Sequence, residues 1–395
     1  MTEVSIILPT YNRADVLPRA IASVLAQSFQ DWELIVIDDG STDNTAEVVV
    51  GIDPRVRLLR KENGGCYVAR NHGLRASTGK FITFLDSDDE WLPHFLELTT
   101  SFLKAFPEEH YVMTEFWADW GSGTLTRENR TTFGRIWRRA RDIGSTALDL
   151  RDGVTDENLR VYDSCEPIGA WGRDIAAHAG FPDSLVYQGK ISRHYRWECL
   201  GWVPSTMLTR QALETVGLYP EDFRIGADHR FFVRLSDLFR TNMIAVPTGI
   251  KHDAAPDNRP LSEGHLASGQ NEYRYAKNRL ALFNEMFMAP GGADPETERI
   301  FGLYHLYAGR TALELSMRNE SLMHLRTASR LLPDQASPRR LRTLVFLVPS
   351  GRLSGFLYRS AMRTKEIAKL VISGKMSAGE LFGKVWKRLG GGVSG

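Results

Sequence analysis

Three short polar clusters in the N-terminal part of the chain carry side chains that could do chemistry. They are Pro9-Thr10-Tyr11-Asn12-Arg13, Asp38-Asp39-Gly40-Ser41 and Asp86-Ser87-Asp88-Asp89, and each directly follows a short apolar run. Together they supply carboxylates, hydroxyls and an arginine. Such a set suits a ligand that carries both hydroxyl groups and phosphate charge, held with the help of a cation.

The spacing of Asp86 and Asp88 has a specific chemical reading. Two carboxylates two residues apart on an extended segment can flank one hard cation, and oxygen ligands without a His/Cys set favour Mg²⁺ or Mn²⁺ shared with substrate phosphates. An isolated pair of this kind is usually a solvated acidic turn. Here the pair follows the apolar run Phe81 to Leu85. We therefore expect metal–diphosphate chemistry.

The elements that must position these clusters alternate between two periodicities. Short continuous apolar runs predict buried strands; they cover 4–9, 32–37, 56–59, 81–85 and 111–116. Helical spacing predicts helices between them, at 16–29, 45–50, 67–76 and 90–106. This alternation predicts an α/β fold with a mostly parallel, doubly wound sheet. Ligands bind such sheets outside the carboxyl ends of the strands, where the three clusters fall.

The rest of the chain divides by pattern. Residues 118–200 have weak periodicity. After them the pattern predicts helices at 211–216 and 228–239 and a strand at 243–246. Two further helices are predicted at 271–288 and 298–318. We expect a nucleotide-sugar-binding half at 1–117, an acceptor-binding half at 118–268, a helical region at 269–340 and a basic amphipathic tail at 341–395.

Two long segments resemble a known family. VSIILPTYNRADVLPRAIASVLAQSFQDWELIVIDDGSTDNTAEVV and NGGCYVARNHGLRASTGKFITFLDSDDEW look like the nucleotide-sugar domain of family 2 inverting glycosyltransferases, which have the GT-A fold. A second match, between Val203 and Leu235, contains STMLTR and VGLYPEDFRIGADHRFFVRL. The resemblance implies a Rossmann-like, mostly parallel sheet with helices on both faces, followed here by a helical C-terminal region.

The resemblance implies a role for each matched residue. Donor binding falls to Pro9, Thr10, Tyr11, Arg13, Asp38, Asp39, Arg70 and Asp86. Within that set Asp39 matches the carboxylate that hydrogen-bonds the base, and Arg70 lies in the match to the motif near the donor phosphates. Asp88 matches the direct metal ligand, with Asp86 and His252 as further candidates. The expected donor is a nucleotide-diphospho-sugar, with UDP as the nucleotide.

Asp228 aligns with the second acidic residue of the family's Glu-Asp pair, the proposed catalytic base; the first position is Ala227, a departure from the pattern. A sugar hydroxyl is too weakly acidic to attack alone, so one carboxylate within hydrogen-bond reach can take its proton. A single displacement of this kind inverts the anomeric carbon. A carboxylate at a helix N-terminus is also favoured by the helix dipole alone.

Other candidates carry weaker signals. His252 follows the predicted strand at 243–246, where related enzymes often place a histidine near the metal or diphosphate; a satisfied surface or core histidine explains it as well. Trp171, Trp197 and Trp202 could stack on a sugar in the acceptor cleft, although tryptophans are more often core. The pair Gly64-Gly65 suits either a backbone approach to the diphosphate or a plain turn.

Composition excludes several classes of protein. The chain has 395 residues, 43% of them apolar and 25% charged, which argues against a mostly disordered chain. Its three cysteines show no spacing for a disulfide framework or a structural zinc. No apolar run reaches the ~18 residues that a membrane span needs, and the N-terminus lacks a signal-peptide pattern.

The net charge of +1 conceals a strong asymmetry. Residues 321–395 hold fourteen Lys or Arg and three Asp or Glu, a net +11, whereas the other residues hold 35 basic and 45 acidic groups, a net −10. The stretches 356–371 and 381–389 are basic and amphipathic. They favour an anionic membrane surface, with docking on the protein or oligomerisation as the alternative. No nucleic-acid-binding module is visible.

These observations predict a metal-dependent inverting glycosyltransferase in cell-surface glycan or polysaccharide synthesis. It would act on a saccharide or lipid-linked acceptor and lie in the cytoplasm, peripheral at the inner face of the membrane. One alternative is a catalytically inactive nucleotide-sugar or glycan-binding module. Another is a sugar-phosphate nucleotidyltransferase, but such enzymes open with a glycine-rich basic loop after the first strand, and Pro9 to Arg13 contains no glycine.

Overall fold

The computed structural model describes residues 2–119, 125–128, 161–196, 199–221, 226–252, 269–288, 293–333, 338–339 and 342. Internal contacts divide the chain into two units, Met1–Glu263 and Gly264–Gly395. The four-part division expected from the sequence stays a prediction. The amphipathic stretches 356–371 and 381–389 lie outside the described residues.

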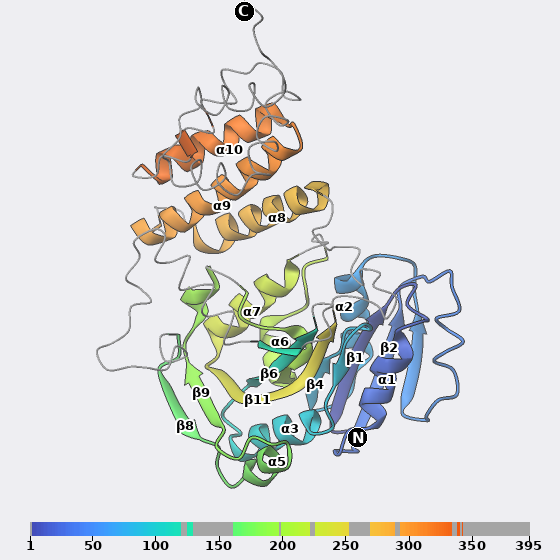
Figure 1. The fold of residues 1–395 in the computed structure, drawn as a ribbon. Helices are drawn as coiled ribbons and strands as arrows, with labels where there is room; N and C mark the ends of the chain where they lie inside the picture. Colours follow the sequence, from blue (N-terminus) through green and yellow to red (C-terminus); the bar gives the residue numbers. More distant parts are fainter. Residues whose placement is uncertain are drawn as a thin grey trace, which may run out of the picture. The chain divides into compact units, whose positions relative to one another are not determined.

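One mixed sheet organises the first unit (Figure 1). Its strands follow the order β3-β2-β1-β4-β10-β6-β11-β9-β8, with β5 paired to β11 and β7 to β6. In chain order they are β1 Val4–Thr10, β2 Trp32–Asp38, β3 Val56–Arg60, β4 Phe81–Phe84, β5 Glu90–Trp91, β6 Tyr111–Asp119, β7 Leu125–Glu128, β8 Ser164–Pro167, β9 Leu185–Gly189, β10 Thr206–Thr209 and β11 Thr241–His252.

The core of this sheet is parallel, which confirms the predicted fold class. β1 runs parallel to β2 and β4, β2 to β3, and β6 to β11. β10 lies antiparallel between β4 and β6, and β9 and β8 extend the sheet antiparallel beyond β11. The sheet is therefore an α/β core with antiparallel additions, which come largely from the part of the chain with weak periodicity.

Helices cover both faces of the parallel strands, so every residue of β1 and β2 is buried. α1 (Leu17–Leu25) packs its apolar side on one face, where Ile6, Leu8 and Val36 lie. α2 (Cys66–Ala76) covers the other face so closely that a Cβ on Gly73 would lie 2.6 Å from the side chain of Ile37. Ile7 of β1 also faces α2, whereas its neighbours Ile6 and Leu8 face α1, which is the period of two expected of a strand.

Further helices complete the first unit. They are α3 Phe95–Ala105, α5 Arg173–His178, α6 Arg210–Val216 and α7 Ala227–Leu238, with 3₁₀ turns η2 Ser192–Arg196 and η3 Val203–Ser205. α3 begins at Phe95, not at the predicted Glu90, because Glu90 and Trp91 pair with β11. The helix predicted at 45–50 is a run of turns, and its three consecutive valines suit a helix poorly.

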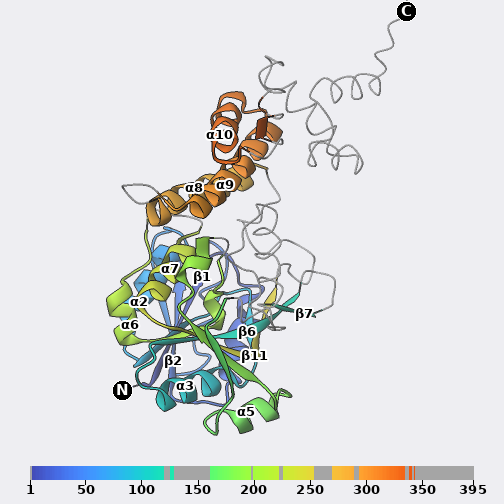
Figure 2. The same cartoon turned by 90° about the vertical axis from the view of Figure 1, so that its left-hand side faces the viewer.

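The second unit contains α8 Gly269–Phe287, α9 Pro295–Glu314 and α10 Arg318–Leu331 (Figure 2). α9 begins at its N-cap Asp294, whose side chain accepts hydrogen bonds from Glu296 N and Thr297 N. It ends before Ser316, where φ is +64° and the chain turns into α10. The sequence predicts α8 and α9 but runs α9 to residue 318. Among the described residues, no helix has the length and apolar character to cross a membrane.

Candidate active site

The three polar clusters of the sequence meet at one edge of the sheet. In register, Thr10 at the end of β1 lies beside Asp38 at the end of β2. The turns beyond are joined as well: Asn12 N donates to Ser41 Oγ at 2.9 Å, and Arg13 Nη2 lies 3.9 Å from Asp88 Oδ2. Parallel strands therefore bring these residues together as predicted, because their carboxyl ends share an edge.

Asp38 and Asp39 are neighbours with different surroundings. Asp38 is fully buried, its Oδ1 accepts the N–H of Ser41 at 2.8 Å, and Arg60 Nε lies 3.5 Å from its Oδ2. These contacts hold the turn after β2. Pro9, one residue before the end of β1, is equally enclosed within the strand. Both residues thus shape the backbone of the site.

The carboxylate of Asp39 is surrounded by donors. Lys61 Nζ lies 2.6 Å from Oδ1, Gly64 N donates to Oδ1 at 3.0 Å, and Gly65 N donates to Oδ2 at 2.7 Å. Gly65 can take part because its φ of +92° turns its N–H toward Asp39 at the start of α2. The sequence did not single out Lys61, since one lysine in a charged loop carries no distinguishing pattern.

Arg70 on α2 forms an ion pair with Asp86 after β4. The Arg70 side chain is 7% exposed and that of Asp86 is 29% exposed, so the guanidinium is buried while the carboxylate reaches solvent. The resemblance places both residues at the donor, and the structure brings them into contact. Tyr11 is half-buried at the end of β1, and the buried Thr10 Oγ1 has no hydrogen-bond partner in the described part of the chain.

Acidic groups crowd the turn after β4. Burial, followed by the charge of Asp86, raises the pKa of Asp88 to about 6. Burial and then Asp88 raise the pKa of Asp89 well above its usual range, although Asp89 Oδ1 accepts the N–H of His252 at 3.0 Å. Carboxylates so disfavoured in their ionised form are the donors that a divalent cation would stabilise.

His252, at the end of β11, reaches this acidic turn. Its Nε2 lies 2.9 Å from Glu90 Oε1, and its Nδ1 lies 3.9 Å from Asp119 Oδ2. Within the described ranges, no three His, Cys, Asp or Glu side chains gather as a metal-binding group. Mg²⁺ usually takes one or two carboxylates from a protein and its other ligands from phosphate and water.

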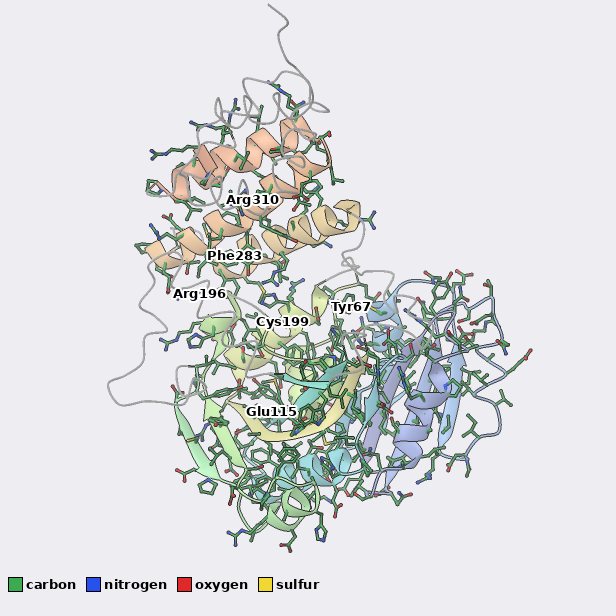
Figure 3. All side chains as sticks on the ribbon, viewed as in Figure 1. Tyr67, Glu115, Arg196, Cys199, Phe283 and Arg310 are labelled. Atoms are coloured by element: carbon green, nitrogen blue, oxygen red, sulfur yellow. The ribbon has the colours of Figure 1, made fainter. Side chains whose placement is uncertain are left out.

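Asp228 lies in the first turn of α7, which starts after Gly226 at φ +88°. Its Oδ1 accepts the N–H of His229 at 2.9 Å and lies 3.4 Å from the hydroxyl of Tyr67, which in turn accepts the N–H of Gly226 at 3.1 Å. Tyr67 is labelled between α2 and α7 in Figure 3. The sequence does not predict a role for Tyr67, because a tyrosine at helical spacing is typical of a core residue.

Both described tryptophans of this set, Trp171 and Trp202, are partly buried and pack against aromatic rings. Trp171 packs edge-on against Phe102 and Phe106, with ring centres 5.3 and 6.1 Å away, so its place is the apolar core. Trp202 packs against Phe116, with ring centres 4.1 Å apart. Trp197 lies outside the described residues. Acceptor stacking by Trp202 stays a prediction.

Known glycosyltransferases are similar to the N-terminal part of this chain. Residues 5–155 match the family model "Glycosyl transferase family 2". Over 102 residues the chain is 45% identical to the Escherichia coli UDP-Glc:alpha-D-GlcNAc-diphosphoundecaprenol beta-1,3-glucosyltransferase WfgD, covering 25% of this chain and 40% of that protein. Over 104 residues it is 41% identical to the putative teichuronic acid biosynthesis glycosyltransferase TuaG of Bacillus subtilis, covering 25% of this chain and 41% of that protein.

A solved structure extends the likeness over most of the chain. Staphylococcus aureus TarS residues 1–349, in complex with UDP-GlcNAc, aligns with a TM-score of 0.53 and 14% identity, covering 94% of this chain and 92% of that one. The fold is thus of the GT-A class. Residues 5–155 are similar to glycosyltransferase family 2. The chain spans less than half the length of the two curated relatives described.

Proposed function

We propose that this chain is a metal-dependent inverting glycosyltransferase. It transfers a sugar from a nucleotide-diphospho-sugar to the hydroxyl of a saccharide or lipid-linked acceptor, in cell-surface glycan or polysaccharide synthesis. The observation that carries the proposal is that α2 links the two halves of the reaction: Arg70 pairs with Asp86 on the donor side, and Tyr67 reaches Asp228 on the other.

The donor is a UDP-sugar bound at the strand ends. The names of two similar proteins support UDP: WfgD is described as using UDP-Glc, and TarS was solved with UDP-GlcNAc. The nucleoside lies against Pro9, Thr10 and Tyr11, where the buried Thr10 Oγ1 is available to a ligand hydroxyl. Asp39 recognises the base, with Asp38 holding the turn beside it.

Two arginine side chains supply positive charge for the diphosphate of the donor. Arg13 lies 3.9 Å from Asp88, and Arg70 pairs with Asp86, so both arginines stand at the turn after β4. A guanidinium matches phosphate oxygens in a planar, two-donor geometry. The two arginines would hold the leaving group and stabilise the charge that it gains as the glycosidic bond breaks.

The donor set fits Mg²⁺ or Mn²⁺. Asp88 and Asp86 would hold the ion, and His252 would join them if its contact with Glu90 were exchanged. Oxygen ligands and one imidazole suit either cation. The ion would supply charge neutralisation for the diphosphate leaving group. Arg13 partly balances Asp88 without it.

Asp228 is the general base. The acceptor oxygen attacks the anomeric carbon while the bond from that carbon to the diphosphate oxygen breaks, and the acceptor proton passes to the carboxylate. Oδ1 of Asp228 is engaged by His229 N and Tyr67. Attack from the face opposite the leaving group inverts the anomeric centre, and no second nucleophilic carboxylate is needed.

The C-terminal tail binds an anionic membrane surface from the cytoplasmic side, and no nucleic acid takes part. The net charge of +11 in residues 321–395 supports this placement. Vesicle flotation of the full chain and of a chain without residues 350–395 tests it. The full chain should float with anionic vesicles and the shortened chain should not; equal partitioning would contradict the placement.

The activity itself is tested by release of nucleoside diphosphate from a panel of nucleotide sugars, with a saccharide or lipid-linked acceptor, in Mn²⁺ and in EDTA. Metal-dependent release should occur with a UDP-sugar, and NMR should show the product with the opposite anomeric configuration to the donor. Donor binding without turnover on any acceptor would instead identify a binding module. Retention of configuration would contradict the single displacement.

A further inference from the structure

Tyr67 connects two elements that are far apart in the sequence. It lies in the first turn of α2, yet its hydroxyl reaches the first turn of α7, accepting the N–H of Gly226 at 3.1 Å and lying 3.4 Å from Asp228 Oδ1. The side chain is 7% exposed. The buried Tyr67 hydroxyl therefore lies between the N–H at the start of α7 and the carboxylate of Asp228, and both are within its hydrogen-bonding range.

The direction of these hydrogen bonds follows from the chemistry of the groups. A tyrosine hydroxyl has one proton and accepts as well as donates. Because it accepts the Gly226 N–H, and because an ionised carboxylate only accepts, its proton is directed to Asp228. Burial, followed by the charge of Asp228, raises the pKa of Tyr67 well above its ordinary value, so the hydroxyl keeps its proton near neutral pH and can donate it.

The two oxygens of Asp228 are thereby distinguished. Oδ1 receives the hydroxyl of Tyr67 and the N–H of His229. Oδ2 accepts no hydrogen bond from the described residues. One oxygen is therefore fixed by the protein, and the other is left for a proton arriving from an acceptor hydroxyl.

The ring of Tyr67 is held in place separately from its hydroxyl. It stacks on Tyr219 with ring centres 5.6 Å apart, and Tyr219 stacks on Phe231 of α7 at 4.5 Å. These contacts join α2 to α7 through aromatic faces. Replacing Tyr67 by phenylalanine would keep them and remove the hydroxyl alone.

We propose that Tyr67 is a positioning residue that fixes the carboxylate of Asp228 for proton removal from the acceptor. The inference rests on the proposed role of Asp228 as the general base. Since Arg70, three residues further along α2, pairs with Asp86, one helix sets both the donor side and the base. Movement of α2 would then disturb both sides of the reaction together.

The test compares Tyr67→Phe with a matched change, Tyr219→Phe. Tyr219 is also a buried tyrosine of this aromatic stack, but within the described residues its hydroxyl has no hydrogen-bond partner. Tyr67→Phe should lower kcat about 10- to 100-fold, as a misplaced catalytic group does. The KM for the donor should stay at the wild-type value, so that the loss falls on kcat alone.

Donor affinity by calorimetry should stay at the wild-type value in both variants, and Tyr219→Phe should keep the wild-type kcat and melting temperature. Tyr67→Phe should lower the melting temperature slightly, because the Gly226 N–H loses its acceptor. If both variants lose kcat equally, ring packing explains the loss and the positioning role is overturned. Asp228→Asn is measured in parallel. An inactive Asp228→Asn beside a fully active Tyr67→Phe overturns only the positioning role, whereas a fully active Asp228→Asn overturns the base and its positioning residue together.

Discussion

Lys61 Nζ lies 2.6 Å from Oδ1 of Asp39, the carboxylate that the proposed function assigns to the nucleobase. The N–H groups of Gly64 and Gly65 approach the same carboxylate. A carboxylate offers about four lone-pair sites, and these contacts occupy most of them. Lys61 and the base of a donor therefore compete for Oδ1, and we infer that donor binding displaces the lysine.

Replacing Lys61 by methionine should strengthen donor binding and weaken the fold. Removing the competing ammonium group frees a site on Oδ1, so donor affinity by calorimetry should rise about 3- to 10-fold. Asp39 is 3% exposed and loses a charged partner, so the free energy of unfolding should fall by ~1–3 kcal/mol.

Lys104→Met is the matched control, because Lys104 pairs with Glu3 on the surface with 44% of its side chain exposed. It should change stability by no more than ~1 kcal/mol. A weaker donor affinity in Lys61→Met would contradict the competition and would indicate that Lys61 itself contacts the donor.

Asn71→Ala should separate α2 from the segment that leads to α7. The buried amide of Asn71 accepts the N–H of Tyr219 at 2.9 Å and donates to its carbonyl at 2.8 Å. Its loss leaves both backbone groups unpaired, so denaturant unfolding should show a decrease of ~2–4 kcal/mol. Asn44→Ala, at an exposed position of the first unit, should have little effect. Equal losses in the two variants would contradict a specific role for Asn71.

The helical unit should lose stability in acid. Burial, followed by His324, lowers the pKa of His305 from its ordinary 6.5 to about 4, and their Nδ1 atoms lie 3.0 Å apart. Because the unfolded chain binds the proton more readily, stability is full above pH ~6.5 and falls as the pH drops toward ~4. Hydrogen exchange of α9 amides, corrected for intrinsic rates, should speed up over this window.

His305→Phe should flatten that dependence, since the ring keeps its packing on Phe301 but no longer titrates. His178→Ala on the surface of α5 should leave the exchange of α9 unchanged. An identical pH dependence in His305→Phe and the wild type would assign the effect to other groups.

Much of the site could be predicted from the sequence because parallel strands place their carboxyl ends together. Buried runs such as Trp32 to Ile37 reveal the strands, and the polar residues after them then converge without further information. Asp86 and Asp88 stand where this reasoning expects them, and Arg70 joins Asp86. The antiparallel additions could not be foreseen, since β8 and β9 show no clear alternation of apolar and polar residues.

The contacts of Lys61 and Tyr67 in the site could not be predicted from the sequence, for a different reason. Lys61 and Tyr67 act across loops and helices, and neither occurs in a local pattern that predicts a contact with Asp39 or Asp228. The sequence pattern predicts a helix that begins at Glu90, but the pairing of Glu90 with Ile250 places it in a strand. Such tertiary pairings override local propensity, and only the folded chain reveals them.

The proposed reaction depends on removal of the acceptor proton by Asp228 during sugar transfer. It is tested most directly by kcat for Asp228→Asn at saturating donor and acceptor, with donor affinity measured on the same preparation. We expect a loss of about 10²- to 10⁴-fold in kcat with unchanged donor affinity, because a general base contributes this much to the rate. A kcat within about 3-fold of the wild-type value, with donor bound normally, would contradict it.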